Sequence, residues 1–180
     1  MATNNIIADD LQIGSDFKIG NFCIIEKGCV FENNVTIGNY THIKKNTKLG
    51  NNTTVGNYCE IGDCLIAGED VIIQGRVRMA DNCTIENNVT IKYGTILTSR
   101  VLLKMNSFLG PNVITLGSTH QRETVHGTVI GKNTYIGAGT KIGGGAQIGD
   151  DIIIGAMSFV NKTLNDTGIY IGIPVKRLEK

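Results

Sequence analysis

The sequence predicts an all-β solenoid in which short strands wind around one long apolar core, and three observations lead to this fold. Every sixth residue is apolar from 7 to 109, and the same period returns three positions out of step from 130 to 160, so that all 24 hexads carry an apolar residue. The following residue is Gly in 13 of the 24 hexads. The fifth position of the hexad is small or apolar and never charged.

A period of six excludes the two common alternatives, because an amphipathic helix repeats its apolar residues every three to four positions and a flat strand every two. A six-residue unit holds one short strand and one turn. Asn and Gly, frequent in the rest of the hexad, tolerate the positive φ of a sharp turn. Three units make a triangular coil, and coils stack about 4.8 Å apart, as paired strands do. The 24 hexads therefore predict about eight coils.

The composition excludes several classes of function. Seventeen basic and sixteen acidic residues give a net charge of +1, without the basic excess of a nucleic-acid binder. Aromatic residues make up 6% and Trp is absent, which disfavours a stacking platform for bases. The chain contains no run of 18 apolar residues and its N-terminus does not resemble a signal peptide, so we expect no membrane insertion and a cytoplasmic location.

The five cysteines are expected to be reduced thiols. Cys23, Cys29, Cys59 and Cys83 occupy the fifth hexad position, which points inward, so we expect them to fill the core. Cys64 falls at a turn position. No Cys-x-x-Cys pair is present, and we expect no metal site.

The repeat breaks once, at residues 115–129. We therefore expect one domain over residues 1–180, with coils at about 7–114 and 130–165, a loop at 115–129 and a C-terminal tail at 166–180. Loops on rigid scaffolds often carry chemistry, and this one holds His120 and His126, two of the three histidines. The alternative is a surface insertion without a function.

The hexad resembles that of the hexapeptide-repeat acyltransferases, whose fold is a left-handed parallel β-helix, and the handedness is implied by this resemblance alone. The stretch GPNVITLGSTH is similar to the segment before the catalytic His of sugar O-acetyltransferases of the galactoside, maltose and nodulation-factor type. In both, Pro-Asn-Val is followed by six residues and then His, here His120. The resemblance implies that His120 is the general base, which the usual imidazole pKa of about 6.5 suits. Glu123 could orient the His120 ring or contact substrate, and His126 could orient substrate or simply be solvated.

Residues 136–180 align without a gap to the C-terminal signature of the same family, which implies binding of acetyl-CoA as acyl donor. Ala138 matches a residue whose backbone N–H faces the thioester carbonyl and stabilises an oxyanion. Gly155 and Ala156 match small residues beside the pantetheine arm. Lys162 and Lys176 match positions near the CoA phosphates, although both could be ordinary solvated lysines. The chain departs from the signature at four positions: Tyr135, Met157, Asn161 and Val175.

The outward sixth position suggests an oligomer, because its apolar residues gather in the C-terminal half. The outward apolar residues after the first ten hexads are Ile72, Ile96, Leu102, Phe108, Ile114, Ile153 and Phe159. The resembled family is trimeric, with active sites between subunits, so we expect a homotrimer.

The resemblance implies an acetyl-CoA-dependent acetyltransferase that acts on a sugar. Within this class we expect the amine of a nucleotide-linked amino sugar as acceptor, because the repeat starts at residue 7 without the N-terminal helical segment of the maltose and galactoside types and so resembles the compact nucleotide-sugar N-acetyltransferases. A sugar or glycan hydroxyl is the alternative acceptor, and the local motif around His120 favours it. A γ-type carbonic anhydrase shares the fold but needs three His on one metal, whereas His42 lies about four coils, roughly 20 Å, from the loop. A non-catalytic β-helix scaffold is the remaining hypothesis.

Overall fold

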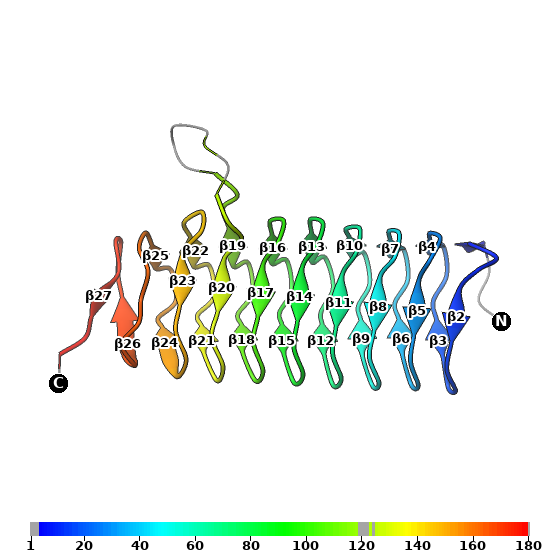
Figure 1. The fold of residues 1–180 in the computed structure, drawn as a ribbon, viewed down its shortest axis with the longest axis horizontal. Helices are drawn as coiled ribbons and strands as arrows, with labels where there is room; N and C mark the ends of the chain where they lie inside the picture. Colours follow the sequence, from blue (N-terminus) through cyan, green and yellow to red (C-terminus); the bar gives the residue numbers. More distant parts are fainter. Residues whose placement is uncertain (1–3, 119–122, 124, 180) are drawn as a thin grey trace.

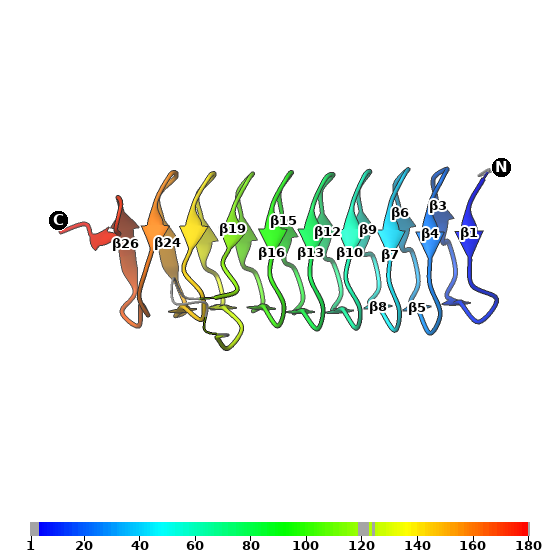
Figure 2. The ribbon, with the colours of Figure 1, turned by 90° about the horizontal axis from the view of Figure 1, so that it is seen from above.

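The computed structural model describes residues 4–118, 123 and 125–179, and it confirms the predicted solenoid. The described residues form three parallel sheets, A, B and C, which are the three faces of a long triangular prism (Figure 1). Seen from above, the coils stack in nearly straight file from the N-terminus to the C-terminus (Figure 2). The arrangement is consistent with a left-handed β-helix, and the described part of the chain contains no α-helix.

Almost all strands are two residues long, and up to β26 consecutive strands belong to different sheets. Sheet A contains, in spatial order, β1 (Ile6–Ile7), β4 (Ile24–Ile25), β7 (His42–Ile43), β10 (Glu60–Ile61), β13 (Arg78–Met79), β16 (Ile96–Leu97), β19 (Ile114–Thr115), β22 (Lys141–Ile142) and β25 (Phe159–Val160). Sheet B contains β2 (Gln12–Ile13), β5 (Val30–Phe31), β8 (Lys48–Leu49), β11 (Ile66–Ala67), β14 (Thr84–Ile85), β17 (Leu102–Leu103), β20 (Val129–Ile130) and β23 (Gln147–Ile148). Sheet C contains β3 (Lys18–Ile19), β6 (Thr36–Ile37), β9 (Thr54–Val55), β12 (Ile72–Ile73), β15 (Thr90–Ile91), β18 (Phe108–Leu109), β21 (Tyr135–Ile136), β24 (Ile152–Ile154), β26 (Gly168–Ile171) and β27 (Lys176–Arg177).

The solenoid has about nine turns, one more than the eight coils expected. The strands beyond the 24 hexads are β19, β26 and β27. The apolar period does not predict β19, because its inward residue is the polar Thr115. At the far end, β26 pairs in parallel with β24, and β27 folds back antiparallel to β26. The last coil is thus covered by chain from the tail.

The turns between strands follow the expected geometry. Residues at the fourth hexad position adopt positive φ along the solenoid, as at Asn34 (57°) and Gly94 (71°). Asn and Gly accept this conformation at little cost. Tyr40 and Tyr58 also adopt it, and their rings stack with centroids 5.1 Å apart, so contacts between coils offset the local preference here.

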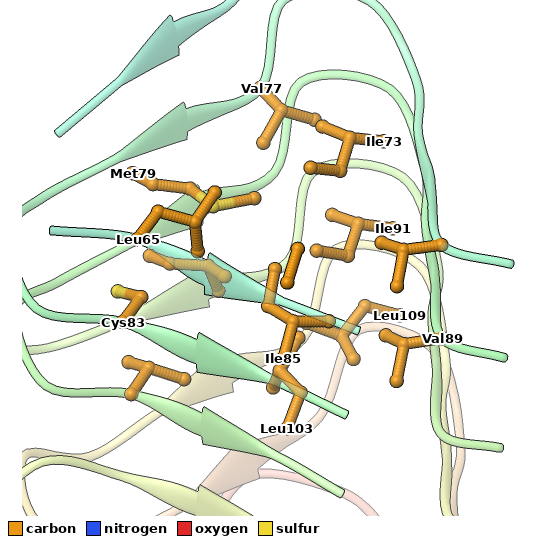
Figure 3. Packing of buried hydrophobic residues seen from close by; sticks show 14 of the residues in the cluster. Leu65, Ile73, Val77, Met79, Cys83, Ile85, Val89, Ile91, Leu103 and Leu109 are labelled. Carbon is orange, nitrogen blue, oxygen red and sulfur yellow. The ribbon is translucent and has the colours of Figure 1, made fainter. Parts of the chain in front are cut away.

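The core lies inside the prism and is built from the first and fifth hexad positions. Ile61, Ile85 and Leu103 are each at most 1% exposed, and Figure 3 shows neighbouring coils interdigitating such side chains. The first coil is the exception, because no coil packs beneath it. Ile7 and Ile13, which the pattern predicts to be internal, are 39% and 53% exposed.

The predicted role of the cysteines as core residues is confirmed. Cys23, Cys29, Cys59 and Cys83 are buried, whereas Cys64 is half-buried in a turn with φ of 58°. Burial raises the pKa of the Cys59 and Cys83 thiols to about 11. Since the thiolate is the reactive form, these two thiols are chemically inert near neutral pH.

Replacing Ile85 by Ala is expected to lower the free energy of unfolding by about 2–5 kcal/mol, because it leaves a cavity between coils. The matched control is Ile66→Ala on the same sheet, where the side chain points outward and is 52% exposed. The control should cost well under half as much. Urea denaturation of both variants measures the difference, and equal losses would contradict the inward and outward assignment.

In the native protein Cys64 is expected to react first with a coloured disulfide reagent at about pH 8, since its thiol is only half-buried whereas the other four cysteines are buried. Cys64→Ser should remove the fast phase of the reaction. Cys83→Ser should leave that phase unchanged. A fast phase that persists in Cys64→Ser would mean that the core opens on the timescale of labelling.

Candidate functional site

The loop-bearing break in the solenoid is a change of register between β17 and β20. Neighbouring coils from β1 to β25 are otherwise offset by 18 residues, as for Asn33 and Asn51, whereas Asn106 bonds Asn133 across an offset of 27. At the C-terminal end the offset falls to 16, as between Ile152 and Gly168. The difference, 27 − 18 = 9 residues, leaves the prism as the loop between β19 and β20 (Figure 1). The strands extend one residue further into this segment at each end than expected, so the loop covers 116–128.

Backbone hydrogen bonds on the prism hold both ends of the loop. Leu116 N–H donates to the Ile142 carbonyl at 2.8 Å, and Leu102 N–H donates to the Thr128 carbonyl at 2.9 Å. The returning chain passes very close to the preceding coil at Gly127, where a Cβ would overlap the carbonyl oxygen of Arg100. Only glycine fits this crossing.

The following coil offers the loop a surface without side chains, the turn Gly143-Gly144-Gly145. A Cβ at Gly144 would lie 2.8 Å from Val125 Cγ2 and 3.0 Å from the Ser118 carbonyl oxygen. Val125 therefore packs directly on turn backbone. Gln147 Nε2 adds hydrogen bonds to the carbonyls of Gly127 and Gly145 at 3.2 and 3.1 Å. The loop thus has a rigid base on both sides.

A cavity of about 260 Å³ lies between the loop and the coil on its N-terminal side. His126 and Leu116 line it from the loop, and Thr98 and Arg100 line it from the coil below. Thr98 is fixed by Thr115, whose hydroxyl lies 2.8 Å from Thr98 N and 2.9 Å from Thr98 Oγ1. The sequence alone does not single out Thr98 and Arg100, although Thr98 lies 18 residues before the start of the loop at 116 and Arg100 lies in the same turn.

Of the residues expected in the loop, His120 lies outside the described residues, so its predicted role as base stays a prediction. Glu123 and His126 are both exposed. His126 contributes to the cavity wall. The roles of Glu123 and His126 also stay predictions.

The residues predicted to hold the acyl donor form a second cluster, at the corner where sheet C turns into sheet A. Pro111, Ala138 and Ala156 occupy the same turn position in successive coils. The backbone N–H groups of Ala138 and Ala156 have no hydrogen-bond partner among the described residues, whereas the equivalent N–H of Asn39 donates to Asn57 Oδ1 at 2.7 Å. Side chains larger than methyl are absent from these two positions, so a ligand could reach both N–H groups.

The remaining expected residues lie around this corner or beyond it. Gly155 is half-buried beside Ala156, and Met157 next to it is 70% exposed. The sulfur of Met157 lies over Gly139, where a Cβ would collide with it, so this departure from the family signature narrows the corner. Lys162 is exposed in the turn after β25, at the corner of sheets A and B that also carries the loop, and Lys176 is exposed in β27. The structure does not bring the two lysines together.

The loop and the Ala138–Ala156 corner border the same prism face, sheet A, from its two opposite edges. The chain runs from Ala138 across β22 to Gly143 at the base of the loop in five residues, a span of at most about 17 Å. The outward face between them carries Lys141, whose Nζ donates to the Asn112 carbonyl at 3.3 Å.

Outward apolar residues lie on all three sheets, with Ile96, Ile114 and Phe159 on sheet A, Leu102 on sheet B, and a row on sheet C. Ile72, Tyr135 and Ile153 are each 44% or 45% exposed, and the rings of Phe108 and Tyr135 stack with centroids 4.9 Å apart. This row of apolar side chains runs beside the Ala138–Ala156 corner.

His42, the third histidine, lies in β7, four strands from β19 within sheet A. Its Nε2 lies 2.7 Å from Glu26 Oε1, which gives it a structural partner. Within residues 4–118, 123 and 125–179, no group of three or more His, Cys, Asp or Glu could hold a metal ion. Over the same residues, no helix has the length and apolar character needed to cross a membrane.

Comparison with known proteins finds one matching family model and solved structures that share this fold. The family model "Bacterial transferase hexapeptide (six repeats)" matches residues 28–63 and 127–162, and no curated protein matches. A UDP-N-acetylglucosamine acyltransferase structure aligns with a TM-score of 0.66 and 19% identity over 97% of this chain and 71% of its own. LpxA, a UDP-N-acetylglucosamine acyltransferase from Bacteroides fragilis 9343, aligns with a TM-score of 0.64 and 13% identity over 99% of this chain and 73% of its own.

The chain spans 59% of other matched structures, among them PerB from Caulobacter crescentus, with a TM-score of 0.46 and 17% identity over 99% of this chain. At these identities the structural matches establish the fold and leave the activity open. The sequence match rests on the same six-residue period that builds the coils. The repeat model thus matches two segments of the chain, and the solved structures share its fold, in line with the resemblance of its sequence to hexapeptide-repeat acyltransferases.

Proposed function

We propose that the protein is an acetyl-CoA-dependent acetyltransferase. The observation that carries the proposal is the pair of unpartnered backbone N–H groups at Ala138 and Ala156, on a corner that lacks large side chains. Donors fixed in a rigid frame stabilise an oxyanion without reorganising during the reaction. The residues therefore fit a thioester whose carbonyl oxygen lies at Ala138 and whose pantetheine arm runs past Gly155 and Ala156. Lys162 and Lys176 would then serve the phosphates of the donor.

In this mechanism acetyl-CoA supplies the acetyl group as a thioester. The lone pair of the acceptor amine or hydroxyl forms the bond to the carbonyl carbon. His120 accepts the proton that the acceptor loses in this step. The Ala138 N–H donates a hydrogen bond to the carbonyl oxygen and stabilises the negative charge that develops on it. When the carbon–sulfur bond breaks, His120 returns the proton to the sulfur, so the base is regenerated and the free thiol leaves.

The acceptor that we propose is the amine of a nucleotide-linked amino sugar. Two structures that share this fold are named as acyltransferases of UDP-N-acetylglucosamine, which supports a nucleotide sugar as the class of acceptor. The names do not support the amine itself, because the nitrogen of N-acetylglucosamine is already acylated. A sugar hydroxyl is the second candidate. The spacing from Pro111-Asn112-Val113 to His120, similar to that of sugar O-acetyltransferases, favours it.

The active unit that we propose is a homotrimer. In one chain the loop and the Ala138–Ala156 corner lie on opposite edges of sheet A. A loop from one copy that reaches the corner of the next copy would join the two halves of the site. The apolar row on sheet C, which runs beside that corner, provides a surface for such packing.

The first experiment follows CoA release from acetyl-CoA with a thiol reagent, against a panel of nucleotide-linked amino sugars and free sugars. His120→Ala should lose roughly 10²-fold or more in turnover with the preferred acceptor. His42→Ala is the matched control, because His42 lies four strands away in the same sheet, and it should retain activity. Equal turnover in His120→Ala and wild type would remove His120 from the mechanism, and absence of both turnover and acetyl-CoA binding would favour a scaffold.

Ala138→Pro tests the oxyanion donor, because proline lacks an N–H. Pro111 already occupies the equivalent turn position one coil earlier, so the substitution fits the backbone. Turnover should fall by roughly 10²–10³-fold while the melting temperature stays close to that of wild type. Ala138→Gly keeps the donor and should keep activity within a few-fold. An active Ala138→Pro variant would exclude this N–H from the reaction.

A further inference from the structure

A second and larger cavity, of about 580 Å³, lies away from the loop on the corner between sheets C and A. It is lined by residues of three successive coils, those that contain β9, β12 and β15 (Figure 1). Thr54 and Ile72 form its floor on sheet C, and Tyr58, Arg76 and Tyr93 form its wall at the corner. The proposed transfer of an acyl group does not involve any of these residues.

An asparagine ladder ends at this cavity. Asn21 N–H donates to Asn39 Oδ1 at 2.8 Å, and Asn39 donates to Asn57 Oδ1 from its backbone N–H and its Nδ2 at 2.7 and 3.2 Å. The next rung is Gly75, which offers no side-chain acceptor. The N–H and Nδ2 of Asn57 and the N–H of Gly75 therefore have no partner among the described residues. All of these donors belong to residues that line the cavity.

A column of stacked aromatic rings is interrupted by an arginine at the same coil. The rings of Phe22, Tyr40 and Tyr58 stack in succession, with centroids 4.9 and 5.1 Å apart. Arg76 takes the next position, and its guanidinium carbon lies 5.7 Å from the centroids of both Tyr58 and Tyr93. The two rings hold the guanidinium in place without using its N–H donors.

The charge of Arg76 is not balanced by an acid. None of the ion pairs among the described residues involves it. The turns and sheet C strands along this corner carry Arg76 and Lys92 but no Asp or Glu, over residues 54–59, 72–77, 90–95, 108–113, 135–140 and 153–158. The site therefore combines a fixed cation, three unpartnered N–H groups and a local surplus of positive charge.

We propose that this cavity binds a phosphorylated small molecule, with the phosphate on Arg76 and the end of the asparagine ladder. Arginine presents paired donors to a phosphate, and charge-assisted hydrogen bonds of this kind are the strong ones. Phosphate matches the site better than carboxylate, because the donors of Asn57, Gly75 and Arg76 outnumber what two carboxylate oxygens can accept in one plane. Ile72 and the Tyr58 ring offer an apolar surface to the rest of the ligand.

The test uses the full ¹⁵N-labelled chain and follows backbone amide signals by NMR. Inorganic phosphate at constant ionic strength should shift the Asn57 and Gly75 amides in a saturable manner. Phenyl phosphate should bind more tightly, because its ring can lie on Ile72. Sodium acetate distinguishes a carboxylate site, and sodium chloride controls for ionic strength. Acetate binding as tight as phosphate would overturn the choice of phosphate, and absence of saturable shifts would overturn the site.

Two variants and a matched control complete the test. Arg76→Gln should raise the dissociation constant for phosphate at least fivefold. Gly75→Asn restores the missing rung, gives Asn57 an acceptor and should abolish the shift of its amide while the charge of Arg76 remains. Arg78→Gln removes an equally exposed arginine of the same coil, one that pairs with Glu60 at 2.9 Å, and should change the constant less than twofold. Equal weakening by Arg76→Gln and Arg78→Gln would reduce the effect to general surface charge.

Discussion

The hydrogen bonds between successive coils set the geometry of the whole molecule. Almost every strand is only two residues long, so it has no stability of its own and depends on its neighbours in the coils before and after it, which along most of the prism lie 18 residues away. This register repeats through all three sheets and forces equivalent hexad positions into straight columns along the prism. The sites described above lie in such columns of equivalent residues, or at the points where a column is interrupted.

The insertion between β19 and β20 shows how strongly this register constrains the chain. Because both flanking strands must rejoin their sheets, the nine extra residues can only leave at the corner. Gly127 permits the return past Arg100, and the glycines at 143–145 leave room for Val125. The base of the loop is therefore as rigid as the solenoid, and the same coils that exclude it from the core fix the direction in which it leaves.

Much of this structure could be predicted from the sequence, because a period of six with glycine after each apolar residue leaves few alternatives. The inward residues, the turns at positive φ and the buried cysteines were all predictable. Thr115 was not, since a polar inward residue resembles the end of the repeat and is explained only by its hydrogen bonds to Thr98. Ile7 and Ile13 differ from the expectation because a period carries no information about the end of a stack.

The two sites differ in what the sequence could indicate. His120 and Ala138 were found through motifs, whereas the cavity at Arg76 depends on columns that appear only once the 18-residue register is known. Even then Tyr93 lies one hexad position away from the aromatic column that it continues, so its contact with Arg76 follows from the missing side chain at Gly75. Local absences of this kind are difficult to recognise without coordinates.

Because the coils stack uniformly, distances along the axis of the solenoid come in equal steps. Positions on one corner are separated by whole multiples of about 4.8 Å, so Gly75 and Ala138, three coils apart, lie about 14 Å from each other along the axis. Insertion or removal of a complete 18-residue unit between them would change this separation by one step and leave the local geometry at both ends intact. The distance between two sites in such a fold therefore changes in steps of one coil, and insertion of a coil lengthens it without altering either site.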